Sequence, residues 1–128
     1  MSTDPPLRAP DARTKIAEII ARHGGRAAAI SIAQIAAVTG LSPRIIKQHV
    51  HDLRLLGMRI GSCRVADGDA VAGYYLVQTR GELVESLRPY QRQIVTELRL
   101  VRSLLGRPLP AAVELEGQLA LELGESRQ

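Results

Sequence analysis

Apolar residues in the first half of the chain recur at steps of three and four, which is the spacing of one helical face. Three such segments each begin near a residue suited to an N-cap, namely Asp11, Ser31 and Ser42, and each ends near a glycine. The third also has a proline at its first helical position, where no amide hydrogen is missed. We therefore expect helices at about 11–23, 32–38 and 43–56.

After Gly57 the periodicity of the sequence changes. Residues 58–65 and 73–77 contain β-branched and aromatic side chains, and the intervening sequence ADGDAVA contains turn-forming residues. This pattern predicts a two-stranded hairpin, and residues 27–31 are a candidate for one further brief strand.

A long helix is predicted from about 80 to 105, opened by a capping pattern at Thr79 and Glu82. Its ~25 residues would extend ~38 Å, which exceeds the width of a small domain, so part of its apolar stripe needs another partner. The same helix of a second copy is the simplest partner, in a parallel or an antiparallel pair, and a monomer in which the helix folds back is the alternative. The stripe assigned to this dimer contact contains Leu83, Leu87, Tyr90, Ile94, Leu98, Val101 and Leu105.

The helix expected at 43–56 has two different faces. At about 100° per residue, Ile46, Val50 and Leu53 lie on one side and form an apolar seam. The polar and basic side chains away from this seam are Arg44, Lys47, Gln48 and His51. Arg44 and Lys47 can donate hydrogen bonds to guanine, and the amide of Gln48 can pair with adenine. The imidazole of His51 can contact a base or a phosphate. Such a helix fits the major groove of DNA, with the Ser42 hydroxyl and the free amides of the first turn near a phosphate. A charged face that is only solvated is the alternative.

The segment IAAVTGLSPRIIKQHVHDLRLLGMRIGS, followed by GYYL, resembles the winged helix-turn-helix of the biotin-operon-repressor type over roughly residues 14–77. The matching positions are Gly40, Leu41, Ser42, Arg44, Ile46, Leu53, Gly57, Gly73, Tyr74 and Leu76. The resemblance implies a winged helix-turn-helix fold in which Arg44, Lys47 and Gln48 face double-stranded DNA. The residues that follow Arg44 depart from the family's pattern, so the family's base preference does not carry over.

In a fold of this type the hairpin is the wing, and its charges decide how it can meet DNA. Asp67 and Asp69 at the expected tip would repel phosphates. We therefore expect wing contacts from Arg59 and Arg64 along the strands, with solvated strand arginines as the alternative.

The net charge of +4 is unevenly distributed along the chain. Residues 1–65 carry ten Lys and Arg against four Asp and Glu, whereas residues 66–128 carry seven against nine. The basic first half predicts an anionic partner, for which nucleic acid is the first candidate.

The sequence QLALEL near the end resembles the hexapeptide with which bacterial replication proteins dock into the sliding clamp. The candidate clamp-binding residues are Gln118, Leu119, Leu121 and Leu123. The resemblance implies a polar subsite for Gln118 and an apolar pocket for Leu121 and Leu123. A small amphipathic helix or a strand are the alternatives for the same residues.

No phosphate-binding loop, metal-ligand cluster or nucleophile with a base partner is present, so we expect no enzymatic activity and no metal or cofactor. The single cysteine fits a reducing compartment. The first residues lack the pattern of an export signal, and no apolar run approaches the ~18 residues of a membrane span. We expect a cytoplasmic, nucleoid-associated protein that makes no membrane contact.

Taken together, the patterns favour a mainly α chain with a small β-hairpin wing, in which a winged helix-turn-helix precedes a long C-terminal helix. The function they favour is that of a small bacterial or phage transcriptional regulator, which binds a palindromic DNA site as a homodimer. The alternatives are a replication or repair accessory that recruits the sliding clamp, and a winged-helix adaptor that binds an acidic protein. The expected organisation is a disordered arm at 1–10, a DNA-binding domain at 11–78, a dimerising helix at 79–106 and an acidic tail at 107–128.

Overall fold

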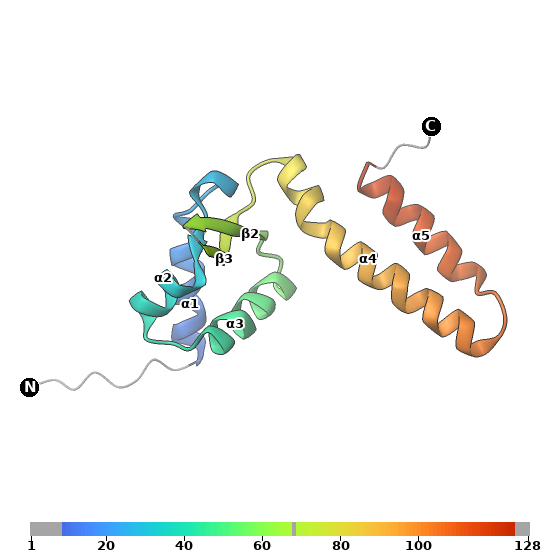
Figure 1. Cartoon of the computed structure of the whole chain (residues 1–128), viewed down its shortest axis with the longest axis horizontal. Helices are drawn as coiled ribbons and strands as arrows, with labels where there is room; N and C mark the ends of the chain where they lie inside the picture. Colours follow the sequence, from blue (N-terminus) through green and yellow to red (C-terminus); the bar gives the residue numbers. More distant parts are fainter. Residues whose placement is uncertain (1–8, 68, 125–128) are drawn as a thin grey trace, which may run out of the picture. The chain divides into compact units, whose positions relative to one another are not determined.

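The computed structural model describes the backbone of residues 9–67 and 69–124, and the side chains of 11–64 and 72–124. The chain is mainly helical with a small antiparallel sheet, and it divides after Glu82 into two compact units (Figure 1). Its elements are α1 (Ala9–Ala21), the 3₁₀ helix η1 (Arg26–Ala28), β1 (Ile30–Ser31), α2 (Ile32–Thr39), α3 (Pro43–Leu55), β2 (Ile60–Asp67), β3 (Asp69–Leu76), α4 (Arg80–Leu105) and α5 (Pro110–Glu122).

The expected helices of the first unit are present, and two of their three predicted caps are confirmed. The Ser31 hydroxyl accepts from the amide of Gln34 at 3.1 Å, and the Gln34 side chain accepts from the amide of Ser31 at 3.0 Å. The Ser42 hydroxyl accepts from the amide of Ile45 at 3.3 Å and opens α3. These side chains satisfy amides that have no partner within their own helix.

The prediction that Asp11 is the N-cap of the first helix is wrong, because α1 begins at Ala9 and Asp11 lies inside its first turn. The helix can start earlier because Pro10 is tolerated in a first turn, where the amide hydrogen that proline lacks would have had no helical acceptor. A carboxylate in the first turn remains favourable toward the helix dipole.

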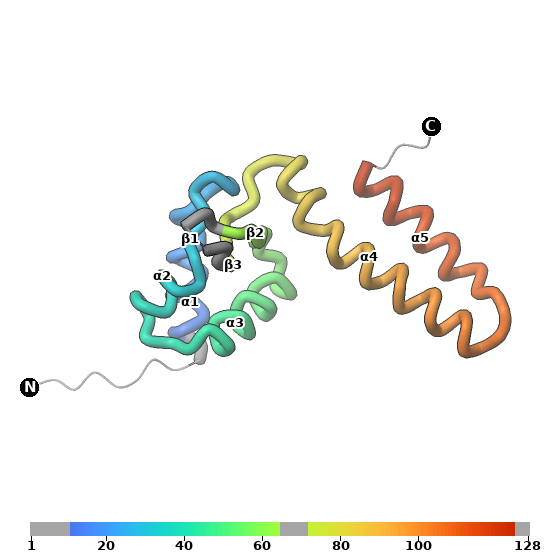
Figure 2. Tube along the Cα trace, viewed as in Figure 1, coloured from blue at the N-terminus to red at the C-terminus, as the bar shows by residue number. Residues whose placement is uncertain are grey.

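The core of the first unit joins one face of each of its helices to one face of the sheet. The loop from α2 to α3 is short, and Gly40 closes α2 with a φ of 74°, in the left-handed region that glycine adopts readily (Figure 2). The buried core cluster contains Ile16, Ile19, Ile20, Ile30, Ile32, Ile35, Ile46, Val50, Leu53, Ile60 and Tyr74. This cluster is therefore built from branched aliphatic side chains, with Tyr74 as its one aromatic member, and Tyr75 is buried outside it.

The sheet has three strands in the order β1–β3–β2. Two of them form the predicted hairpin, and β1 lies in the segment 27–31 that the sequence marks as a candidate for one further brief strand. The short β1 pairs antiparallel with β3, with Ile30 opposite Tyr74. The strands β2 and β3 pair from Ile60 opposite Leu76 to Asp67 opposite Asp69. The hairpin strands therefore extend through most of the segment predicted as a turn, because residues 70–72 continue the ladder.

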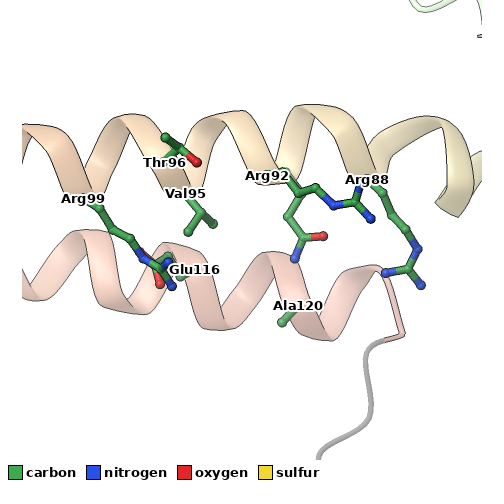
Figure 3. A pocket seen from close by; sticks show the side chains of 8 residues that line it. Arg88, Arg92, Val95, Thr96, Arg99, Glu116 and Ala120 are labelled. Atoms are coloured by element: carbon green, nitrogen blue, oxygen red, sulfur yellow. The ribbon is translucent and has the colours of Figure 1, made fainter.

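The second unit consists of the greater part of α4 together with α5. The two helices lie side by side (Figure 3), and Ala112 and Leu123 of the α5 region are buried. Residues 110–122 of the segment assigned as an acidic tail thus form a helix. Among the described helices, none combines the length and the apolar character needed to cross a membrane.

Burial in α3 leads to a stability prediction with a matched control. Ile46 is fully buried, whereas its neighbour Ile45 is 45% exposed. We expect Ile46→Ala to lower the free energy of unfolding by about 2–5 kcal/mol, because it removes buried methyl groups and leaves a cavity. The same truncation at Ile45 should cost much less. Urea unfolding of both variants checks this, and equal losses would contradict the assigned face of α3.

The carboxylate of Glu82 leads to a prediction about pH. It accepts from the amide of Arg26 at 2.8 Å and from the amide of Gln78 at 2.9 Å, and these bonds lower the pKa of Glu82 below its ordinary value of 4.5. A lowered native pKa stabilises the fold above the unfolded pKa, and this contribution is lost as the pH falls through the native pKa. The urea midpoint of Glu82→Gln should therefore lie below that of the parent at neutral pH, and the difference should shrink on acidification below 4.5. A difference that persists unchanged in acid would contradict this role.

Candidate nucleic-acid interface

Helix α3 separates its apolar and polar side chains as the sequence predicts. Ile46 and Val50 are fully buried, and Leu53 is 8% exposed. The predicted contact residues Ser42, Arg44, Lys47, Gln48 and His51 are all exposed. The structure thus brings Arg44, Lys47, Gln48 and His51 together on the open side of α3, whose other side is fixed in the core, and places Ser42 at the N-cap of this helix.

The two histidines of α3 lie on different sides of the helix. His51 is exposed, whereas His49 is 7% exposed, and its Nδ1 has no hydrogen-bond partner among the described residues. His49 lies about 60° from the centre of the seam, at its edge, so the periodicity of the apolar residues does not reveal its burial. Only His51 is available to a partner on the open face.

Gln48 is held by a contact that the sequence analysis missed. Its Nε2 donates to Oδ1 of Asp52 at 3.1 Å, and Oδ2 of Asp52 lies 3.7 Å from the guanidinium of Arg13 in α1. The spacing of four residues between Gln48 and Asp52 is a recognised signal for such a bond, whereas the ion pair to Arg13 depends on how α1 packs. Asp52 thereby restricts the orientation of the Gln48 amide, and Arg13 offsets the negative charge beside the basic face.

Arg54 joins the end of α3 to the hairpin, and the sequence analysis also missed this contact. Its guanidinium donates to the carbonyl of Ile60 at 2.9 Å and to the hydroxyl of Ser62 at 2.7 Å. It also lies over the ring of Tyr74, 5.7 Å from the centroid, at a distance suited to a cation–π interaction. These bonds fix the position of β2 relative to α3.

The predicted strand arginines lie at and along β2. Arg59 precedes the strand and Arg64 lies within it, and both side chains are exposed. Because strand side chains alternate, Arg64 projects to the same side of the sheet as Ser62, which is bonded to α3. Arg26 of η1 lines an open hollow with Ser62 and Arg64, and it is a further cation near the hairpin that the sequence analysis did not assign. Asp67 and Asp69 lie outside the residues whose side chains the structure describes.

Among the described side chains, those of α3 and of residues 59–64 carry more positive than negative charges. Arg44, Lys47, Arg59 and Arg64 form no ion pair with any residue that the structure describes. The only carboxylate of α3 belongs to Asp52, which is occupied by Gln48 and Arg13. A surface with several unpaired cations and one compensated carboxylate is suited to a polyanion.

The residues assigned to a dimer contact all lie on α4, which follows the first unit's helices and hairpin in the sequence. None of the α4 residues is buried, and the exposed members of the stripe are Leu87, Tyr90, Ile94, Val101 and Leu105. Leu83 and Leu98 are half-buried. The stripe therefore has no complete cover within the part of the chain that the structure describes.

The candidate clamp-binding residues lie in α5 and at its C-cap. Gln118 and Leu121 are exposed, Leu119 is half-buried and Leu123 is 6% exposed. In this helix Leu121 and Leu123 point in nearly opposite directions, so the folded segment does not present them to one pocket. Docking into a clamp would require the end of α5 to unwind.

No group of three or more His, Cys, Asp or Glu side chains is placed to hold a metal ion within the described residues. Cys63 is a free thiol, half-buried in β2. Comparison of the chain with protein-family models, with curated proteins and with solved structures found no match.

Proposed function

We propose that this chain is a sequence-specific double-stranded DNA-binding protein that inserts α3 into the major groove. In this proposal α2 and α3 form the helix-turn-helix, and the β2–β3 hairpin is the wing. The role that fits best is that of a small bacterial or phage transcriptional regulator. The observation that carries the proposal is the open face of α3, where Arg44, Lys47 and Gln48 are exposed on a helix anchored by a fully buried seam.

The dimensions and the chemistry of α3 both suit the major groove. The groove is about 12 Å wide and admits one α-helix with its side chains. Arg44 lies in the first turn of α3, and Gln48 lies one turn later on the same side, so both can reach base edges from the N-terminal half of the helix. An arginine can donate two bonds to guanine, and a glutamine can exchange two bonds with adenine.

The hydrogen bond from Gln48 to Asp52 leaves Gln48 able to recognise a base. The amide nitrogen of a glutamine carries two hydrogens, and Asp52 accepts one of them. The second hydrogen and the amide oxygen remain for the N7 and N6 atoms of adenine. A side chain held in this way loses less conformational freedom on binding than a free one.

The hairpin supplies phosphate contacts in this proposal. Arg64 projects on the side of the sheet that Arg54 ties to α3, so a duplex lying along α3 would bring its backbone toward Arg64. Such a contact adds affinity and positions the protein without reading sequence.

A homodimer completes the proposed regulator, since two copies of α3 related by a two-fold axis would read a palindromic site. The exposed stripe of α4 is the surface we assign to this contact. The alternative function of clamp recruitment is less supported, because Leu123 is buried and its segment is helical.

Selection of binding sites from random duplexes tests base reading by α3. We expect Arg44→Ala and Gln48→Ala each to relax preference at particular base positions, by about 1–3 kcal/mol. Arg107→Ala removes the same charge as Arg44→Ala from an exposed position in the second unit and should leave the preference unchanged. An affinity that falls by the same factor for all DNA sequences would mean that α3 contacts the DNA backbone without recognising bases.

The salt dependence of duplex affinity tests the phosphate contact of the hairpin. Each phosphate contact releases counterions, so affinity should fall steeply with salt, and Arg64→Ala should reduce the slope of log K against log salt by about 1. Base preference should be the same as in the parent. A duplex affinity that is insensitive to salt would instead favour an adaptor that binds an acidic protein.

A further inference from the structure

Helix α4 has two faces, and only one of them is covered by α5. The hollow between the two helices is lined on the α4 side by Val95 and several arginines, and on the α5 side by Glu116 and Ala120 (Figure 3). At about 100° per residue, the apolar stripe is centred roughly a third of a turn away from Val95. The partner helix within the same chain therefore leaves the stripe open.

The exposure of this stripe is large for a row of aliphatic and aromatic side chains. Leu87 and Ile94 are each 39% exposed, Tyr90 is 44% exposed and Val101 is 45% exposed. Near its centre, Tyr90, Ile94 and Leu98 line an open apolar hollow with Gln93 and Glu97 at its edge. A continuous apolar row with a polar edge is typical of a surface that binds another protein.

The spacing of the stripe is the same when read from either end. Its successive steps are four, three, four, four, three and four residues, with Ile94 at the centre. An antiparallel partner with its two-fold axis at Ile94 therefore places an apolar residue opposite every member of the stripe. The resulting pairs are Leu83 with Leu105, Leu87 with Val101, Tyr90 with Leu98, and Ile94 with its own copy.

The stripe also repeats every eleven residues, from Leu83 to Ile94 to Leu105. A repeat of eleven residues corresponds to about 3.67 residues per turn, which is close to the 3.6 of a straight helix. Two such helices can stay in contact along the whole stripe, about 33 Å, with little supercoiling.

Side-chain size and polarity fit an antiparallel partner. In that orientation the Tyr90 ring of each copy packs on Leu98 of the other, whereas a parallel pair would place two tyrosine rings in one layer and two valines in another. Layers of similar volume pack without voids or overpacking. At the edge of the stripe, Gln93 of one copy faces Glu97 of the other, where an amide can donate to a carboxylate.

We propose that a second copy of this chain covers the α4 stripe in an antiparallel orientation, with the two-fold axis passing beside Ile94. The pairing itself does not depend on DNA binding.

One consequence of this pairing rests on the proposed function. Glu82, the last residue of the first unit, lies twelve residues before Ile94, so the two copies of Glu82 are about 36 Å apart along the pair. Half-sites on adjacent turns of DNA are about 34–36 Å apart. The antiparallel pair would therefore attach two DNA-binding units at points separated by about one turn, whereas a parallel pair would attach them side by side.

Disulfide cross-linking in a Cys63→Ser background distinguishes the orientations. Leu87→Cys chains mixed with Val101→Cys chains, after exchange of subunits, should form a disulfide-linked dimer, and each variant alone should form little. Strong cross-linking of each variant with itself, and no link between the two variants in the mixture, would overturn the antiparallel pair. Ile94→Cys should link to its own copy, and absence of that link together with a monomeric parent would overturn dimerisation.

Light scattering after size-exclusion chromatography tests the position of the axis. Ile94→Glu brings two carboxylates together at the axis, so it should convert a dimeric parent to monomer. Leu100→Glu introduces the same charge at a 53% exposed position off the stripe and should remain dimeric. A dimeric Ile94→Glu variant, or dissociation by Leu100→Glu, would overturn the assignment.

A DNA-binding measurement separates this inference from the proposed function. The Ile94→Glu monomer should still bind a single half-site with the base preference of the parent. Failure of the parent to bind any duplex, with the cross-links intact, would overturn the function and leave the pairing in place.

Discussion

The structure depends above all on the anchoring of α3 by its apolar seam. Ile46 and Val50 are fully buried against α1 and α2, which fixes the rotation of α3 about its own axis. Because side chains recur every 3.6 residues, this rotation decides which residues face outward. Arg44 and Gln48 are exposed because the opposite side of the helix is buried in the core. A seam shifted by one residue would turn the basic face partly into the core.

Polar contacts around α3 restrain the side chains of its open face and the neighbouring hairpin. Asp52 restricts Gln48 and is itself balanced by Arg13, while Arg54 ties β2 to the end of the helix. The bond between Gln48 and Asp52 lies within α3, whereas Arg13 joins α1 to α3 and Arg54 joins α3 to the hairpin. The second unit contributes a different property, an exposed apolar stripe whose symmetric spacing suits a copy of itself. Recognition and self-association are thus assigned to different parts of the chain.

The local features of this fold could be predicted from the sequence, and the non-local ones could not. The caps at Ser31 and Ser42 and the two faces of α3 follow from residues within a few positions of each other, and the structure confirms them. The strand β1 lies within the segment 27–31 that is a candidate strand in the sequence, but its pairing with β3 is non-local and no local pattern requires it. The bond from Arg54 to Ser62 likewise depends on how the chain returns after Gly57. Helix α5 was one of several alternatives because its alternating leucines suit both a helix and a strand.

Nuclear magnetic resonance tests most directly the proposal that α3 binds duplex DNA with its open face. The backbone amide signals of the labelled full chain would be followed while a selected duplex is added. We expect the largest shifts on residues 43–51 of α3 and on residues 59–64 at β2, with the signals of α5 little changed. Signals of residues 43–51 that stay in place while the duplex binds elsewhere on the chain would contradict it.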